Sequence, residues 1–190
     1  MKVLVGYATR HGATAGIAER VGQTLVRHGY DTTVSAIDAR TDPSPYDAFV
    51  LGSGAYMGRW LNDARRFVLE HAALLDTRPV WLFSSGPIGD AVVDKKGRDV
   101  LEASRPTDFA DLRESIHPRD ERVFFGAFDP DAPPIGVWER IGSPFLRLPA
   151  VRDGMPRGDF RDWPAIESWA EEIAGQLQHV PAPATSGSQP

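Results

Sequence analysis

Residues 2–14, KVLVGYATRHGAT, decide the fold because an apolar run passes directly into a short polar loop that contains a glycine. The run at 2–7 is continuous and rich in β-branched and aromatic residues, which is typical of a parallel strand buried on both faces. Beyond the loop, apolar residues recur at the spacing of an amphipathic helix, at Ile17, Ala18, Val21 and Leu25. This stretch therefore predicts a buried strand that leads through a tight loop into the N-terminus of a helix.

The same alternation of strand and helix continues along the chain. Four more apolar runs predict strands, at 32–37, 48–52, 79–84 and 122–128. Amphipathic segments predict further helices, at 61–75, 108–117 and 163–178. Strands that alternate with helices form a parallel sheet covered on both faces. We therefore expect an α/β fold, a three-layer, doubly wound domain with a five-stranded parallel sheet and a ligand site beyond the carboxyl ends of its strands.

Length and composition set limits on the organisation and on the class of function. We expect 190 residues to form one domain over 1–179, with a long insertion at about 129–159 before the last helix and a disordered tail at 180–190. The absence of cysteine excludes disulfides, thiolate metal sites and a cysteine nucleophile, and the five histidines show no metal spacing, so we expect no metal. The net charge of −5 disfavours nucleic-acid binding. Because no run reaches roughly 18 apolar residues, we expect a soluble, cytoplasmic protein.

The first loop at the predicted carboxyl edge, residues 9–14, suits an anion. The amides of a first helical turn lack internal partners, and the helix dipole favours negative charge there. The hydroxyls of Thr9 and Thr14 add donors, Gly12 permits close approach of the backbone, and His11 could help to neutralise a phosphate. A Walker loop would need a lysine, which this loop lacks. The alternative is that the two threonines only cap the helix.

Four segments together carry a resemblance to a known family. The pattern Thr-x-x-Gly-x-Thr at 9–14 resembles the mononucleotide loop of the flavodoxin-like superfamily. With Tyr46-Asp47-Ala48, Gly52-Ser-Gly-Ala-Tyr-Met-Gly58 and Asp159-Phe-Arg-Asp-Trp-Pro-Ala-Ile166, the chain is similar to the subgroup that includes the menaquinone-dependent protoporphyrinogen IX dehydrogenases. The resemblance implies the strand order 2-1-3-4-5 and FMN at the switch point of the sheet, a placement for which flavodoxin is itself the known example.

The resemblance further implies that FMN is held by three loops at this edge. The expected contacts are Thr9, Arg10, His11, Gly12, Ala13 and Thr14 in the first loop, Gly54, Ala55, Tyr56, Met57, Gly58 and Trp60 in the second, and Ser84, Ser85, Gly86, Pro87, Ile88, Gly89 and Asp90 in the third. Two other interpretations of the loop Gly52–Trp60 stay open. Its glycines could form a dinucleotide-binding motif, although no acidic residue ends a later strand as that motif requires, and Tyr56 and Trp60 could be packing anchors.

Basic residues are frequent at the expected rim of the flavin. We assign four of them to the rim that meets a substrate or partner, namely Arg59, Arg65, Lys95 and Lys96. Cations there would favour a reduced, anionic flavin and would attract a carboxylated substrate. The alternative is that these charges belong to solvated helix faces.

The expected insertion contains an amphipathic patch at 135–148, with Trp138 among its apolar residues. The resemblance suggests that this patch either meets a quinone-bearing membrane, which would place the protein at the inner membrane face, or covers the substrate. The alternative is that the patch packs on the domain or on a second subunit in a homo-oligomer.

Together these features predict an FMN-binding oxidoreductase that accepts hydride or electrons from a reduced organic donor. The resemblance implies protoporphyrinogen IX as the donor, a quinone as the acceptor and a place in heme biosynthesis. We assign no catalytic side chain, because the flavin carries the hydride step. The alternatives are a non-catalytic, flavodoxin-type electron carrier that docks on a redox partner protein and an interaction domain without flavin.

Overall fold

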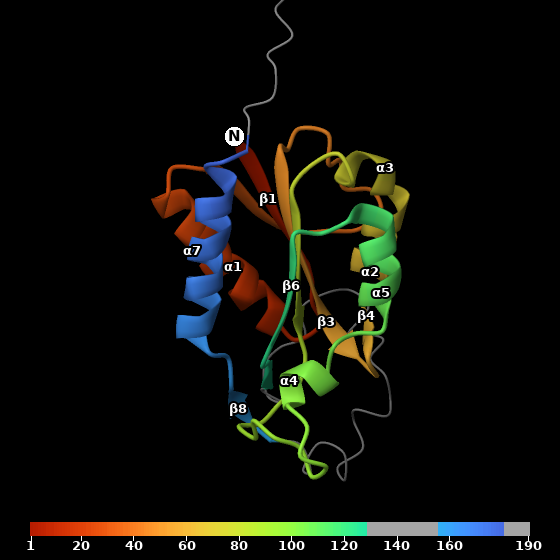
Figure 1. The fold of residues 1–190 in the computed structure, drawn as a ribbon, viewed down its shortest axis with the longest axis vertical. Helices are drawn as coiled ribbons and strands as arrows, with labels where there is room; N and C mark the ends of the chain where they lie inside the picture. The colour runs from red at the N-terminus through yellow and green to blue at the C-terminus, as the bar shows by residue number, and fades with distance from the viewer. Residues whose placement is uncertain (129–155, 181–190) are drawn as a thin grey trace, which may run out of the picture.

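The structure is a computed structural model that describes residues 1–128 and 156–180. Its centre is a parallel sheet with helices on both faces (Figure 1). The parallel strands lie in the order β2-β1-β3-β5-β6. Their bounds are β1 Lys2–Ala8, β2 Asp31–Ala36, β3 Ala48–Tyr56, β5 Val80–Ser85 and β6 Asp120–Phe124. The expected α/β class with a mainly parallel sheet is confirmed.

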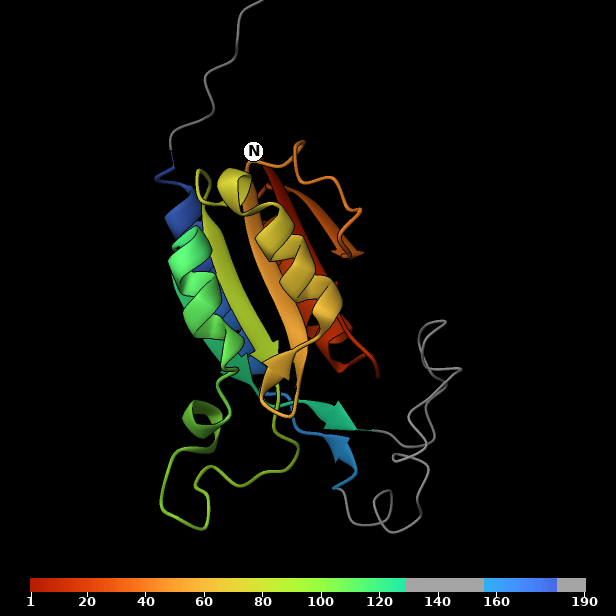
Figure 2. The ribbon, with the colours of Figure 1, turned by 90° about the vertical axis from the view of Figure 1, so that its right-hand side faces the viewer.

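Helices form a layer on each face of the sheet. Helices α1 (Ala13–Arg27) and α7 (Trp163–Leu177) cover one face. The other face is covered by α2 (Asn62–Glu70), α3 (Ala72–Leu75) and α5 (Asp108–Ile116), as Figures 1 and 2 show from two sides. The short helix α4 (Val100–Ala103) follows the long loop after β5.

Both faces of the central strands are buried, which explains their continuous apolar sequences. In β1, Val3 and Val5 belong to the core under α1 and α7, whereas Leu4 belongs to the core under α2 and α5. Since successive side chains of a strand point to opposite faces, one strand supplies both cores. This double burial fixes β1 in the middle of the sheet and so fixes where its carboxyl end lies.

The second predicted loop, Gly52–Trp60, is in fact mostly strand. Strand β3 continues to Tyr56, and β4 (Arg59–Trp60) returns antiparallel to it, with Tyr56 opposite Arg59. The physical reason lies at Gly52, where the ring of Phe83 on β5 covers the position that a side chain would fill. A glycine there indicates close packing inside the sheet rather than the end of the strand.

Three further differences concern helices and strand ends. The helix predicted at 61–75 divides at His71, whose backbone leaves the helical region (φ −112°, ψ 15°) and separates α2 from α3. The last predicted strand ends at Phe124. Beyond it, β7 (Ala127–Phe128) pairs antiparallel with β8 (Gly158–Asp159), which lies shortly before α7 in the chain. Helix α4 was not predicted.

Part of the expected insertion at about 129–159, with the patch at 135–148 and Trp138, lies outside the described residues, as does nearly all of the tail at 180–190. Within residues 1–128 and 156–180, no helix has both the length and the apolar character needed to cross a membrane.

Substitution of two glycines by alanine should change the stability of the fold in opposite directions. A Cβ at Gly52 would lie 2.1–2.4 Å from ring atoms of Phe83, which is itself buried against Trp169. A Cβ at Gly175 in α7 would meet no atom of the described residues within 4 Å. We expect Gly52→Ala to lower the free energy of unfolding by about 2 kcal/mol and Gly175→Ala to raise it by about 0.5 kcal/mol. Denaturant unfolding measures both, and a Gly52→Ala variant as stable as the wild type would contradict the described packing.

Candidate functional site

The candidate site lies at the carboxyl edge, the edge of the sheet where β1, β3 and β5 end side by side. The strand register places Ala8 next to Ser53 and Gly54 next to Ser85. The loop after β1, the end of β3 and the loop after β5 therefore meet there, at the lower end of the molecule in Figures 1 and 2. Parallel α/β sheets bind their ligands at this edge.

The first of these segments, residues 9–14, turns the chain from β1 into α1. Gly12 is the N-cap of α1 and has a left-handed backbone (φ +80°), which glycine adopts without strain. Its N–H donates to the hydroxyl of Thr9 over 3.1 Å. Among the described residues no side chain caps α1, so the amides of its first turn can bind an external acceptor. The described threonines thus do not cap α1, and the donors of its first turn fit an anion.

A buried pair of hydroxyls joins this loop to β5. Thr14 Oγ1 and Ser85 Oγ are 2.7 Å apart, and both residues are almost fully buried. Gly54 stands beside them, since a Cβ at Gly54 would lie 3.4 Å from Thr14 Oγ1. All three predicted loops thus contribute a residue to one point. The neighbouring Ser84, also in β5, does not join this pair and donates to the Ser53 carbonyl instead.

Aromatic and cationic side chains gather beside the first loop. The Arg10 guanidinium lies 4.6 Å from the centre of the Tyr56 ring. The imidazole of His11 lies 6.5 Å from that ring and 6.0 Å from the ring of Phe128 on β7. The half-buried His11 therefore contacts two aromatic rings, and the segment next to the undescribed 129–155 reaches this edge.

The β3–β4 hairpin places a strained turn at the same edge. Its two turn residues, Met57 (φ +51°) and Gly58 (φ +74°), both have positive φ, as a two-residue type I′ turn requires. Met57 is fully exposed. Trp60, which we expected beside the flavin ring, is only 4% exposed and packs edge-on against Phe109, 5.5 Å between ring centres. Trp60 is thus a packing anchor because β4 turns it into the core.

A residue that the sequence analysis missed, Asp108, holds this hairpin. Asp108 begins α5 and is 1% exposed. Its carboxylate accepts hydrogen bonds from the Trp60 backbone N–H (2.8 Å) and from Arg59 (3.0 Å), and it lies 3.3 Å from Arg65 Nε. Two of the expected rim cations are therefore ion-paired with one buried carboxylate. An acidic residue at a helix start is too common to have signalled this role.

The third loop leaves β5 at Ser85 and carries the other two expected rim cations. Lys95 and Lys96 lie on an exposed turn around Asp94, whose carboxylate accepts from the backbone N–H groups of Arg98 and Lys96. These hydrogen bonds, that of Arg98 foremost, lower the pKa of Asp94. Asp94 is also ion-paired with the Arg98 side chain, whereas none of the described contacts pairs either lysine side chain with an acid.

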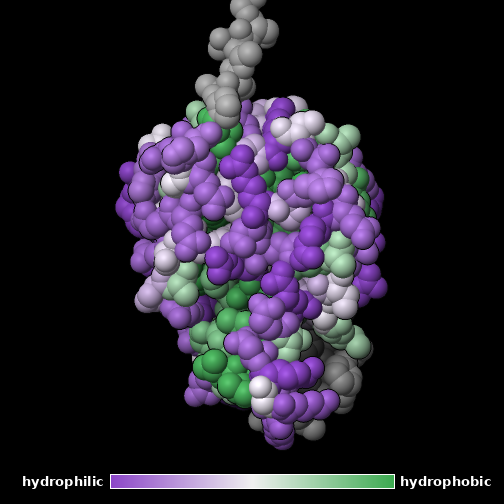
Figure 3. All heavy atoms as spheres, viewed as in Figure 1, coloured by the Kyte–Doolittle hydropathy of each residue, from purple (hydrophilic) through white to green (hydrophobic). Residues whose placement is uncertain are grey.

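Apolar side chains also reach the surface at this end. They gather toward the lower end of the face in Figure 3. The exposed large apolar residues of the site loops are Met57, Val92 and Val93. The end of the molecule that holds the candidate site thus combines exposed apolar groups with cations.

The donor set at this edge fits FMN. A phosphate would find the first-turn amides of α1 with the hydroxyls of Thr9, Thr14 and Ser85 around them. The bare backbone at Gly54 leaves room beside the hydroxyl pair, and the Tyr56 side chain offers an aromatic face at the same edge.

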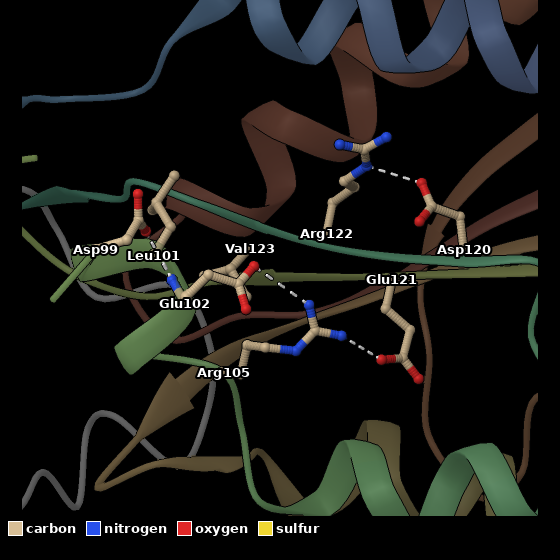
Figure 4. Close-up of a pocket in the computed structure, with 8 residues that line it drawn as sticks. All are labelled: Asp99, Leu101, Glu102, Arg105, Asp120, Glu121, Arg122 and Val123. Carbon is tan, nitrogen blue, oxygen red and sulfur yellow. Dashed lines mark hydrogen bonds and ion pairs between the residues drawn. The ribbon is translucent and has the colours of Figure 1, made fainter.

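A hollow elsewhere in the described structure does not resemble a ligand site. It lies on the outer strand β6 and is lined mainly by charged residues, which Figure 4 shows paired with one another. Arg105 bonds to Glu121 over 2.5 Å, and Arg122 bonds to Asp120 over 2.7 Å. Among residues 1–128 and 156–180, no three histidines or acids come together as metal ligands would.

Comparison with known proteins identifies a family and a shared fold. The chain matches the flavodoxin domain family over residues 4–141. No curated protein matches it. Among solved structures, a flavodoxin from the domain Archaea has a TM-score of 0.57 and 15% identity, covering 94% of this chain and 100% of the other. A mutant flavodoxin from Pseudomonas aeruginosa has a TM-score of 0.53 and 13% identity, covering 94% and 99%.

A larger protein also shares the fold. The rubredoxin oxygen:oxidoreductase from the anaerobe Desulfovibrio gigas has a TM-score of 0.54 and 13% identity, covering 93% of this chain but only 36% of that one. At such identities the structural matches show a common fold.

Removing the carboxylate of Asp108 should release the β3–β4 hairpin. We expect Asp108→Ala to lower the free energy of unfolding by about 2 kcal/mol, because the buried Trp60 N–H then lacks an acceptor. The matched control is Glu70→Ala, which removes an exposed i,i+4 partner of Arg66 and should cost less than about 0.5 kcal/mol. Denaturant unfolding compares the two, and equal losses would contradict the role of Asp108.

Substitutions of two buried threonines of α1 test whether the Thr14–Ser85 hydroxyl pair contributes to FMN binding. We expect Thr14→Val to weaken FMN binding about tenfold, the loss of one hydrogen bond of roughly 1.4 kcal/mol. Thr24→Val is the control, since Thr24 is equally buried in α1 but bonds to the Arg20 carbonyl, a full helix length from the loop. Flavin fluorescence titration measures both dissociation constants. Equal FMN affinity in the two variants would remove Thr14 from the phosphate site.

Proposed function

The chain belongs to the flavodoxin domain family, and on that premise we propose that it is an FMN-dependent oxidoreductase that accepts electrons from a reduced, anionic organic donor and passes them to a quinone. Family membership and the shared fold indicate FMN as the cofactor. When bound, FMN supplies an organic two-electron acceptor, which no side chain can supply. The first loop and Ser85 would hold its phosphate, and the segment from Gly54 to Gly58 would border its ring.

The observation that carries the donor class is the cation set at the carboxyl edge. Arg10 lies over Tyr56, and Arg59 and Arg65 share one carboxylate, which leaves one positive charge uncompensated. Lys95 and Lys96 are exposed on the third loop. Positive charge gathered at one edge draws anions to it, and it stabilises negative charge that arrives there with the electrons. An anionic donor is therefore favoured over a neutral or cationic one.

The resemblance of segments 46–60 and 159–166 to the protoporphyrinogen IX dehydrogenases supports a more specific donor. Protoporphyrinogen IX carries two propionate groups, which suit a cationic rim. Contact of 135–148 with a membrane would bring the quinone to the site, and this part of the proposal concerns residues outside the described ones.

A second candidate function is that of a non-catalytic electron carrier. Its support is the net charge of −5, which would favour docking on a basic partner protein. The two candidates differ in the charged residues that meet the partner. A carrier of this kind would bind its partner through acidic residues, whereas the proposed oxidoreductase attracts its donor through the cations at the carboxyl edge.

The test is turnover by the purified, flavin-loaded protein. We expect steady-state oxidation of protoporphyrinogen IX with menadione as acceptor, and slow reduction by a ferredoxin reductase. The reverse pattern would establish the carrier, and a colourless protein that binds no added FMN would refute both candidates.

Removal of one lysine charge tests whether the cations of the rim attract the donor. We expect Lys96→Gln to raise the KM for protoporphyrinogen about threefold at low salt and to have little effect at high salt, where exposed charges are screened. Lys2→Gln removes the same charge at the opposite end of β1 and serves as the control. A KM equally affected by both variants would show that only net charge matters.

A further inference from the structure

Arg161 connects the segment before α7 with the phosphate loop, and the proposed function makes no use of it. The residue lies in the segment 159–166 that carries the family resemblance. Its Nη1 donates to the carbonyl of Ala13 over 3.2 Å, across 148 positions of sequence. Ala13 is the first residue of α1. The side chain is 16% exposed, so this bond is shielded from water.

The guanidinium of Arg161 is fixed on its other sides too. Asp159 binds it with both oxygens, Nε to Oδ1 over 2.7 Å and Nη2 to Oδ2 over 2.8 Å. Cζ of Arg161 lies 4.3 Å from the centre of the Trp163 ring, which also lies 4.8 Å from Cζ of Arg20 on α1. The hydrogen bond from Arg161 lowers the pKa of Asp159, so the carboxylate is charged at neutral pH. A bidentate pair of this kind holds a planar group in one orientation.

Helix α1 leaves room for this group. A Cβ at Gly16 would lie 2.3 Å from Arg161 Nη1, which is closer than real atoms approach. Glycine is a poor helix former, and Gly16 lies only one turn into α1. Its place there is explained by the guanidinium that occupies the space of a side chain.

We propose that Arg161 is a positioning residue that fixes the first turn of α1 in the geometry that binds a phosphate, and that it thereby sets the preference of the site for FMN over riboflavin. The Ala13 carbonyl and the first-turn amides belong to the same few peptide groups, so a fixed carbonyl fixes the direction of these N–H donors. Because Asp159 neutralises the guanidinium, Arg161 contributes position rather than net charge. The inference rests on the FMN site of the proposed function but on neither its donor nor its acceptor.

The first experiment compares two flavins that differ only in the phosphate. We expect Arg161→Gln to raise the Kd for FMN about tenfold and to change the Kd for riboflavin less than twofold, both measured by flavin fluorescence quenching. Arg161→Lys keeps the charge but loses the bidentate pair, and we expect the same loss of FMN affinity. The control is Arg122→Gln, which removes an arginine with the same Asp-x-Arg pairing on β6, and both flavins should bind it as they bind the wild type.

The second experiment displaces the Arg161 guanidinium by a substitution in α1. Gly16→Ala should displace the guanidinium and weaken FMN binding about tenfold, whereas Gly175→Ala, which meets nothing, should leave FMN affinity unchanged. In an Arg161→Gln background, Gly16→Ala should weaken FMN binding less than twofold further, because the group it displaces is gone. Thermal unfolding of each apoprotein confirms that the variant is folded, and Gly16→Ala provides the same readout should Arg161→Gln not fold.

Three results would overturn the inference: equal loss of affinity for both flavins, full rescue by Arg161→Lys, or additive effects of Gly16→Ala and Arg161→Gln. A wild-type protein that binds FMN but oxidises no donor would refute the proposed donor and would leave the ratio of the two flavin affinities as informative as before.

Discussion

The first turn of α1 has backbone N–H groups that no residue of the helix can satisfy, and the site depends on where these groups lie. The position of the turn is fixed by β1, whose two buried faces leave it one place in the sheet. Gly12 supplies the left-handed residue that lets the chain turn. The Thr14–Ser85 pair ties the turn to β5, and Arg161 ties it to the segment before α7. The buried strand, the glycine turn and two contacts from distant parts of the chain thus hold one set of donors.

The sequence predicted the local part of this arrangement and missed the distant part. Residues 2–14 and the helical spacing that follows them predict a buried strand, a loop and a helix from neighbouring residues alone. Asp108 and Arg161 carry no such signal, because an acid at a helix start and an arginine before a helix are ordinary on any surface. Gly52 misled the prediction, since glycine is depleted in strands and only the ring of Phe83 across the sheet explains its presence. The features that the sequence did not predict are the contacts between side chains that lie far apart in the chain.

Two carboxylates at this edge use the same arrangement. Asp108 accepts from one backbone N–H and an arginine, and Asp159 does the same. Asp159 neutralises Arg161, and Asp108 neutralises one of the two arginines that share it. In both cases the bonds also set a direction, because Asp108 holds the β3–β4 hairpin and Arg161, held by Asp159, bonds to the first turn of α1. Paired charges of this kind are weak evidence for stability. Their effect here is to fix the geometry of two loops, which leaves the field at the site to the cations outside these pairs.

The electrostatic potential at the carboxyl edge and the net charge of the protein have opposite signs. The chain carries −5, yet every helix that directly follows a strand of a parallel sheet begins at the carboxyl edge, with its positive end there. Lys95 and Lys96 add charge at the same edge. Screening limits exposed charges to a range of about 8–10 Å, so acids at the far end of the sheet have little influence on a ligand at the loops. An anion that approaches the site therefore meets the helix termini and the lysines at short range, where acids at the far end of the sheet oppose its binding little.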